Sequence, residues 1–325
     1  MTAISAPSIP LTADNPAQRL RRTAAAVRLH FTWWGTHRTL TNQQKEEVGA
    51  ACSADARLLT AGKRLIDSRY PAVRALTALR GRIGSFWRGL TLPYVEPGVR
   101  LIRQDDIETF VHTLEGFREE LHQAEADLDA VYREIKKDAH RRLGRLYNES
   151  DYPSEVRGLF DVAWEFPNVE PPNYLMRVSP EVYAEERARV AARFEEAVRL
   201  AEQAFASELA ELVDHLAERL APTTEGRPKV FRDSAIANFG EFFTRFAQLN
   251  VRSNPELDAL VERAQGLFRG VSPEQVRSAP ALRQQLQTGM SEVRRQLDGL
   301  VIDAPRRRIV RPQPATNGAN HDPGN

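Results

Sequence analysis

Arginine and aromatic residues lie close together in one short part of the chain. Arg80, Arg82 and Arg88 stand near Trp87, and Arg74 precedes them in the same expected helix. The planar guanidinium of arginine binds phosphate oxygens, and an indole ring can stack on a nucleic-acid base. These five residues are therefore the candidates for nucleic-acid contact. The alternative is a solvated helix face with the Trp87 ring buried in the core.

A second stretch, VRLHFTWWGTHR at residues 27–38, also interleaves basic and aromatic side chains. Its apolar residues alternate with polar ones, and this is the period of a strand. The stretch FDVAWEF, residues 160–166, has the same alternation with acidic residues in place of basic ones. Antiparallel pairing of the two stretches would bury both aromatic faces and set opposite charges against each other. The charged residues concerned are Arg28 and His30 on the first stretch and Asp161 and Glu165 on the second. We therefore expect two core strands and not a base-stacking surface.

The common catalytic signatures fail on inspection. Gly62 and Lys63 resemble the end of a phosphate-binding loop, but Arg57 occupies the position of its first glycine, and Arg64 replaces the required Ser or Thr. The single cysteine, Cys52, excludes an intrachain disulfide, and we expect it to be a small buried hydrophobe.

Metal-binding patterns are no stronger. His112, His122 and His140 are too far apart along one expected helix to bind one metal ion. The acidic residues at positions 105, 106 and 108 fit the start of a helix, where the helix dipole favours negative charge. We therefore expect no catalytic residue, no metal and no cofactor.

Two long helices are expected over residues 104–147 and 180–221, because apolar residues recur in both at spacings of three and four. The matching length and period of the two apolar seams predict an antiparallel, coiled-coil-like helical hairpin. In that hairpin Phe117 and Phe205 would be buried.

The remaining elements predict an α+β fold that is predominantly α-helical, with a small antiparallel sheet and a C-terminal helical bundle. Glu96-Pro97-Gly98-Val99 suits a type II turn, so residues 90–95 and 99–102 should form a hairpin. Residues 55–88 should be mostly helical with a break near Pro71. The expected regions are a disordered start (1–15), a basic region of strand, helix and hairpin (16–103), the helical hairpin with its strand insert (104–221), C-terminal helices (222–303) and a basic disordered tail (304–325).

Charge is divided unevenly along the chain, although the formal net charge is only +1. Residues 15–103 carry a net charge of +11, and residues 104–303 carry −12. This separation indicates either a nucleic-acid partner for the basic part or packing of the basic part on the acidic one within the fold.

The location of the protein is also suggested by its composition. The first eighteen residues lack the charged and apolar regions of a signal peptide. No run of about 18 apolar residues is present, so we expect no membrane span and no membrane partner. With its single cysteine, the chain is expected to be cytoplasmic.

Several segments, taken together, carry a family resemblance. They are AGKRLIDSRY, GLTLPYVEPGVRLI, LGRLYNESDYP, FDVAWEFPNV, LAERL, VFRDSAIANF and LNVRSNPELDAL, and the match spans about residues 27–265 in that order. The set resembles a family of uncharacterised bacterial and phage proteins, including prophage-associated ones, with K-R-L-x-D, L-P-x-x-x-x-G, D-Y-P and F-R-D-S segments. That family has no assigned activity. The resemblance implies an accessory role in the DNA metabolism of phages or plasmids, and it implies no catalytic residues.

These observations favour a non-enzymatic protein of mobile-element type that associates with nucleic acid. One alternative is a structural scaffold that docks a protein partner through its helical hairpin. Another is a metal-dependent enzyme with an unrecognised site. The partner and the oligomeric state do not follow from the sequence.

Overall fold

The computed structural model describes residues 15–220 and 233–302, and it divides into two compact units. The first unit contains Met1–Phe205 and Gly240–Pro255, and the second contains Ala206–Phe239 and Glu256–Asn325. The long helix α6 (Pro180–Leu220) and the helix α7 (Ser234–Leu249) each contribute to both units. The expected C-terminal region therefore shares its helices with the first unit.

A four-stranded antiparallel sheet forms the centre of the first unit, in the order β4-β5-β1-β6. Its strands are β1 (Ala24–Trp33), β4 (Thr91–Pro93), β5 (Val99–Arg103) and β6 (Phe160–Glu165). The predicted pairing of residues 27–33 with 160–166 is confirmed, with Arg28 opposite Glu165 and Trp33 opposite Phe160. The predicted hairpin also forms, and Gly98 has the positive φ of 79° that its turn requires.

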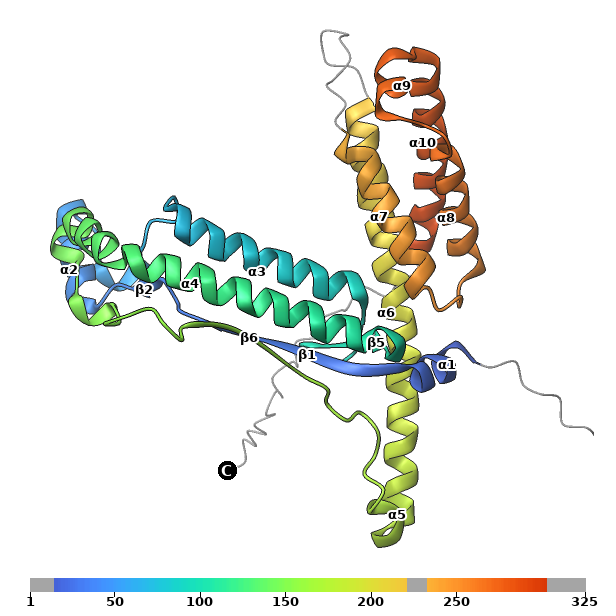
Figure 1. Ribbon diagram of the computed structural model, residues 1–325, viewed down its shortest axis with the longest axis horizontal. Helices are drawn as coiled ribbons and strands as arrows, with labels where there is room; N and C mark the ends of the chain where they lie inside the picture. The colour runs from blue at the N-terminus through green and yellow to red at the C-terminus, as the bar shows by residue number, and fades with distance from the viewer. Residues whose placement is uncertain (1–14, 221–232, 303–325) are drawn as a thin grey trace, which may run out of the picture. The chain divides into compact units, whose positions relative to one another are not determined.

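Two helices lie side by side along this sheet, α3 (Pro71–Leu90) and α4 (Ile107–Leu143) (Figure 1). Their apolar faces and the sheet enclose one hydrophobic core. Its fully buried members include Val27 from β1, Ile83 from α3, Phe110 and Leu121 from α4, and Val162 from β6. The core therefore positions one face of α3 inward and leaves the opposite face in solvent.

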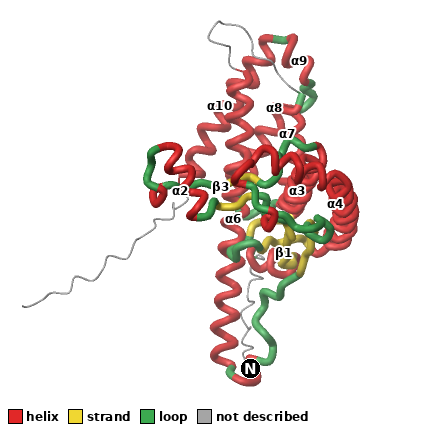
Figure 2. Tube along the Cα trace, turned by 90° about the vertical axis from the view of Figure 1, so that its left-hand side faces the viewer, coloured by secondary structure: helices red, strands yellow, loops and turns green. Residues whose placement is uncertain are grey.

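The expected hairpin of residues 104–147 with 180–221 is wrong. Both long helices are present, but α4 runs alongside α3, and the part of α6 in the first unit takes a different direction (Figures 1 and 2). The apolar residues of α6 are covered elsewhere: Phe194 packs on Tyr94, and Phe205 packs on Phe242 and Phe246 of α7. An apolar seam shows that a helix face is buried, but several surfaces can bury it.

The expectation for residues 55–88 also needs correction. Only a short 3₁₀ turn (Ala56–Leu58) and α3 are helical there, and a strand β3 (Gly62–Arg64) pairs with β2 (His37–Thr39). A helix α2 (Asn42–Cys52) lies between these two strands in sequence. The segment from β3 to Pro71 is thereby an ordered loop whose charged side chains matter below.

The remaining helices are short or belong to the second unit. α1 (Pro16–Thr23) precedes the sheet, 3₁₀ turns occupy Gln104–Asp106, Gly144–Leu146 and Glu149–Asp151, and α5 (Leu175–Val178) precedes α6. The second unit contains α8 (Pro255–Phe268), α9 (Pro273–Ser278) and α10 (Pro280–Ile302) beside its parts of α6 and α7. A Cβ atom at Gly289 of α10 would lie 2.7 Å from Leu267 of α8, so these helices pack closely.

Two expectations fall outside the described residues, namely the disordered start at 1–15, apart from residue 15, and the tail at 304–325. In the described parts of the chain, no helix is both long and apolar enough to cross a membrane.

Candidate functional site

The candidate arginines lie on α3, which the fold holds by its inward residues Leu76, Leu79 and Ile83. Pro71 at the first turn starts the helix, and its fixed φ suits that position. The candidate side chains Arg74, Arg80, Arg82 and Arg88 are all exposed. The sequence of α3 contains these four arginines and no acidic residue.

The four arginines do not share one surface, because Arg80 and Arg82 leave opposite flanks of the helix. Positions two apart are separated by about 200° around an α-helix. Arg82 turns toward α4, where it forms an ion pair with Glu120 at 2.7 Å. Arg80 turns toward the sheet, where its guanidinium lies 5.2 Å from the ring centre of Phe31 and 4.8 Å from that of Trp33.

The stretch at residues 27–33 is mainly core, as expected. Val27 and Leu29 are buried, whereas Phe31 and Trp33 are half-buried beneath the Arg80 guanidinium. Arg28 pairs with Glu165, which confirms the expected opposition of charges across the two strands. His30 approaches the same carboxylate at 3.2 Å, and Asp161 pairs with Arg118 instead.

Trp87 is less available for stacking than the sequence suggests. Its ring is half-buried, and its Nε1 atom is buried without a hydrogen-bond partner among the described residues. The Arg100 guanidinium lies 5.8 Å from the ring centre and donates hydrogen bonds to Thr91. Burial and the nearby charges of Arg88 and Arg245 lower the pKa of Arg100 to about 10. Only part of the Trp87 ring is therefore accessible to a base.

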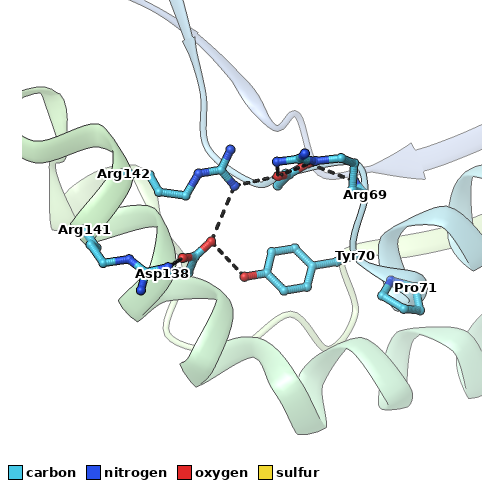
Figure 3. Close-up of a pocket in the computed structure, with 7 residues that line it drawn as sticks. Arg69, Tyr70, Pro71, Asp138, Arg141 and Arg142 are labelled. Carbon is cyan, nitrogen blue, oxygen red and sulfur yellow. Dashed lines mark hydrogen bonds and ion pairs between the residues drawn. The ribbon is translucent and has the colours of Figure 1, made fainter.

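A second group of charged residues, missed by the sequence reasoning, lies at the beginning of α3. We call it the arginine hollow, an open cavity of about 420 Å³ that is lined by residues of the β3–α3 loop and the end of α4. Its members are Asp67, Arg69, Tyr70, Pro71, Asp138, Arg141 and Arg142. Figure 3 shows Arg142 reaching toward Arg69 from the opposite wall, with the Tyr70 hydroxyl directed at Asp138.

Ion pairs and hydrogen bonds join the two walls of the arginine hollow. Arg142 pairs with Asp67 at 2.5 Å and approaches Asp138 at 3.5 Å. Arg69 donates to both carboxylate oxygens of Asp67, and Arg141 pairs with Asp138. The Tyr70 hydroxyl donates to Asp138 at 2.9 Å.

These contacts fix the protonation of the arginine hollow near neutral pH. Hydrogen bonds from Arg69, then from Arg142, hold the pKa of Asp67 far below its usual range. The hydrogen bond from Tyr70, followed by that from Arg141, lowers the pKa of Asp138. Burial and the bond to Asp138 raise the pKa of Tyr70. Both carboxyl groups are therefore charged and the phenol is neutral at pH 7. Such groups are better suited to binding a charged ligand than to transferring protons.

A buried ion pair supports the loop from which Asp67 and Arg69 project. Lys63 is almost fully buried, and its Nζ atom lies 2.6 Å from Asp151 and donates to the Leu146 carbonyl oxygen at 2.7 Å. The buried hydroxyl of Tyr152 donates to the Leu65 carbonyl oxygen at 2.9 Å. The K-R-L-x-D and D-Y-P segments are thus in direct contact, and together they anchor the arginine hollow.

The structure gives no support to a metal site or to a buried cysteine among the described residues. Among the residues that the structure describes, no group of three or more His, Cys, Asp or Glu side chains could hold a metal ion. Cys52 is exposed and not buried as expected, because it lies at the C-terminal end of α2.

Only part of the arginine hollow could be predicted from the sequence. Asp138 precedes Arg141 and Arg142 by three and four residues, which is the spacing of ion pairs on a helix. The approach of residues 67–70 is a tertiary contact, and no sequence period indicates it.

No family model, no curated protein and no solved structure matches the chain.

Proposed function

We propose that the protein is a cytoplasmic, non-enzymatic factor of mobile-element type that associates with nucleic acid, and that α3 contacts the phosphate backbone. One observation carries this proposal. Arg74, Arg80 and Arg88 are exposed on a helix without acidic residues, and none of them forms an ion pair with a carboxylate among the described residues. Guanidinium groups without a carboxylate partner are suited to phosphate oxygens.

Other cations of the basic region form ion pairs with carboxylates. Arg21 pairs with Glu170, Arg28 with Glu165, Lys63 with Asp151 and Arg82 with Glu120. These four pairs balance part of the positive charge of residues 15–103 within the fold. On α3, Arg82 has a carboxylate partner, whereas Arg74, Arg80 and Arg88 have none among the described residues.

The resemblance to phage and prophage proteins supports the same proposal by association. The scaffold alternative loses the surface on which it depended, because the antiparallel hairpin is not formed. The metal-dependent alternative has no candidate cluster among the described residues.

The proposal is tested by fluorescence anisotropy with single- and double-stranded oligonucleotides at about 50 mM salt, where electrostatic binding is strong. We expect micromolar or weaker binding with little sequence preference, as in non-specific complexes. The triple variant Arg74→Gln, Arg80→Gln and Arg88→Gln should weaken binding at least tenfold for every sequence, because phosphate contacts are lost.

The matched control is Arg82→Gln, which removes the same charge from α3 at a position already paired with Glu120. We expect this variant to bind nearly as the wild type does. Absence of wild-type binding at 50 mM salt would refute the proposal, and equal losses in Arg82→Gln and the triple variant would refute the assignment to Arg74, Arg80 and Arg88.

A further inference from the structure

The arginine hollow presents positive charge to solvent although it contains two carboxylates. The Asp67 and Asp138 side chains are only 15% and 19% exposed. The side chains of Arg69, Arg141 and Arg142 are 80%, 79% and 46% exposed. Three guanidinium groups outnumber two carboxylates, so the group carries a net charge of +1, with its cations outermost.

The carboxylates also hold the cations in place. The Arg69 guanidinium is fixed by three hydrogen bonds to Asp67, with its Nη2 atom 2.8 Å from Oδ2. Arg142 spans Asp67 and Asp138. A guanidinium has five N–H donors, and these contacts leave several donors on Arg69 and Arg141 unused. A ligand would then meet oriented donors and would lose less entropy than it would in ordering free side chains.

A further cation adjoins the hollow. Arg64 lines a neighbouring cavity that shares Asp67, Arg69 and Asp138 with the arginine hollow. Its Nη1 atom donates to the Ser68 hydroxyl at 3.3 Å, and it forms no carboxylate ion pair among the described residues. The local charge thereby rises to +2, which outweighs the repulsion that the two carboxylates exert on an anion.

We propose that the arginine hollow is a binding site for a phosphate group, held by Arg69, Arg141 and Arg142. A phosphate group accepts several charge-assisted hydrogen bonds at once, and guanidinium matches its geometry better than ammonium does. Tyr70 positions Asp138 and takes no part in binding, since its hydroxyl already donates to that carboxylate. The site is separate from the proposed α3 contacts and does not require them.

Two kinds of molecule could supply the phosphate group. It belongs either to a small phosphorylated molecule or inorganic phosphate, or to the end of a nucleic acid. The second source has structural support, since Arg74, the first exposed arginine of α3, follows Tyr70 by one helical turn.

The test is calorimetric titration of the full-length protein with sodium phosphate, with sodium chloride at equal ionic strength as the reference. We expect saturable phosphate binding. Arg69→Gln and Arg141→Gln should each weaken it at least tenfold, because each removes a charge-assisted hydrogen bond. Both side chains are largely exposed, so circular dichroism should show folded variants. Arg133→Gln, an exposed arginine on α4 outside the hollow, is the control and should bind phosphate as the wild type does.

A second arm compares oligonucleotides with a 5′-phosphate and a 5′-hydroxyl. Tighter binding of the phosphorylated strand that is lost in Arg141→Gln assigns the site to a nucleic-acid end. Equal binding of both strands, with phosphate binding retained, assigns it to a small phosphorylated molecule or inorganic phosphate.

The double variant Arg74→Gln and Arg88→Gln should still bind phosphate, which separates this site from the α3 proposal. No heat of phosphate binding up to about 20 mM phosphate, well above the ~1 mM dissociation constant of a weak complex, would overturn the inference. Phosphate binding that is unchanged in both hollow variants would also overturn it.

Discussion

Arg80 and Arg82 are two positions apart in the sequence, yet they have different surroundings. Arg82 is paired with Glu120, whereas Arg80 lies over Phe31 and Trp33. Residue type and spacing made both arginines candidates for nucleic-acid contact, but a carboxylate from another helix decides which one remains free. Asp67 is a similar case, because one of its partners, Arg142, is 75 residues away in the sequence. Such contacts could not be predicted from local spacing.

At this scale, the pH dependence of stability tests the arginine hollow. The folded-state pKa of Asp67 lies below its ordinary value of about 3.9, so its contribution to stability is complete above that value and is lost as the pH falls toward the folded-state pKa. Asp67→Asn should therefore lower the melting temperature most at pH 7, and the difference from wild type should shrink between about pH 4 and pH 2.

Thermal melts at several pH values measure this difference. Glu134→Gln is the control, since Glu134 is an exposed carboxylate that pairs with Lys137 within α4, and its difference from wild type should stay small at every pH. A deficit for Asp67→Asn that is as large at pH 3 as at pH 7 would contradict the role given to the ionised carboxylate.

Secondary-structure elements were predictable where one local signal was sufficient. The strands at 27–33 and 160–166 were found because bulky residues alternate on one face, and their opposite charges indicated the pairing that is observed. Helices α8 and α9 begin at Pro255 and Pro273, and proline is common at the first position of a helix because its fixed φ suits that position. The partner of α4 was predicted wrongly because an apolar stripe does not identify the surface that covers it.

Two phenylalanines of α4 distinguish the observed packing from the expected hairpin. Phe110 is fully buried and stacks on Phe86 at 5.8 Å between ring centres, whereas Phe117 is half-buried beside the Arg82 guanidinium. We expect Phe110→Ala to lower the free energy of unfolding by about 3–5 kcal/mol. Phe117→Ala should cost roughly 1–2 kcal/mol, because less apolar surface is lost from the core.

Urea denaturation of both variants measures these free energies. A hairpin seam along α4 and α6 would bury both rings and make the two substitutions equally costly. Equal losses would therefore contradict the packing of α4 on α3 and the sheet.

Across the whole molecule, the net charge is only +1, but some cations form ion pairs with carboxylates and others do not. Ion pairs join basic residues of the first hundred positions to acidic residues that follow them, as in Arg28 with Glu165. The sequence could show the separation of charge but not which cations would be paired after folding. Arg74, Arg80 and Arg88 of α3 have no carboxylate partner among the described residues, and the phosphates of a nucleic acid would supply one.

This distribution predicts a modest salt dependence for nucleic-acid binding. Contacts from Arg74, Arg80 and Arg88 would displace about three counterions, and each contributes about −0.7 to the slope of log K against log salt for a single strand. The expected slope is about −2, so affinity should fall roughly 20-fold between about 50 and 200 mM salt. Anisotropy titrations over this range should give a slope that is less steep by about 0.7 in Arg88→Gln and unchanged in Arg82→Gln. A wild-type slope near zero, or one that Arg88→Gln does not alter, would show that binding is not governed by phosphate contacts on α3.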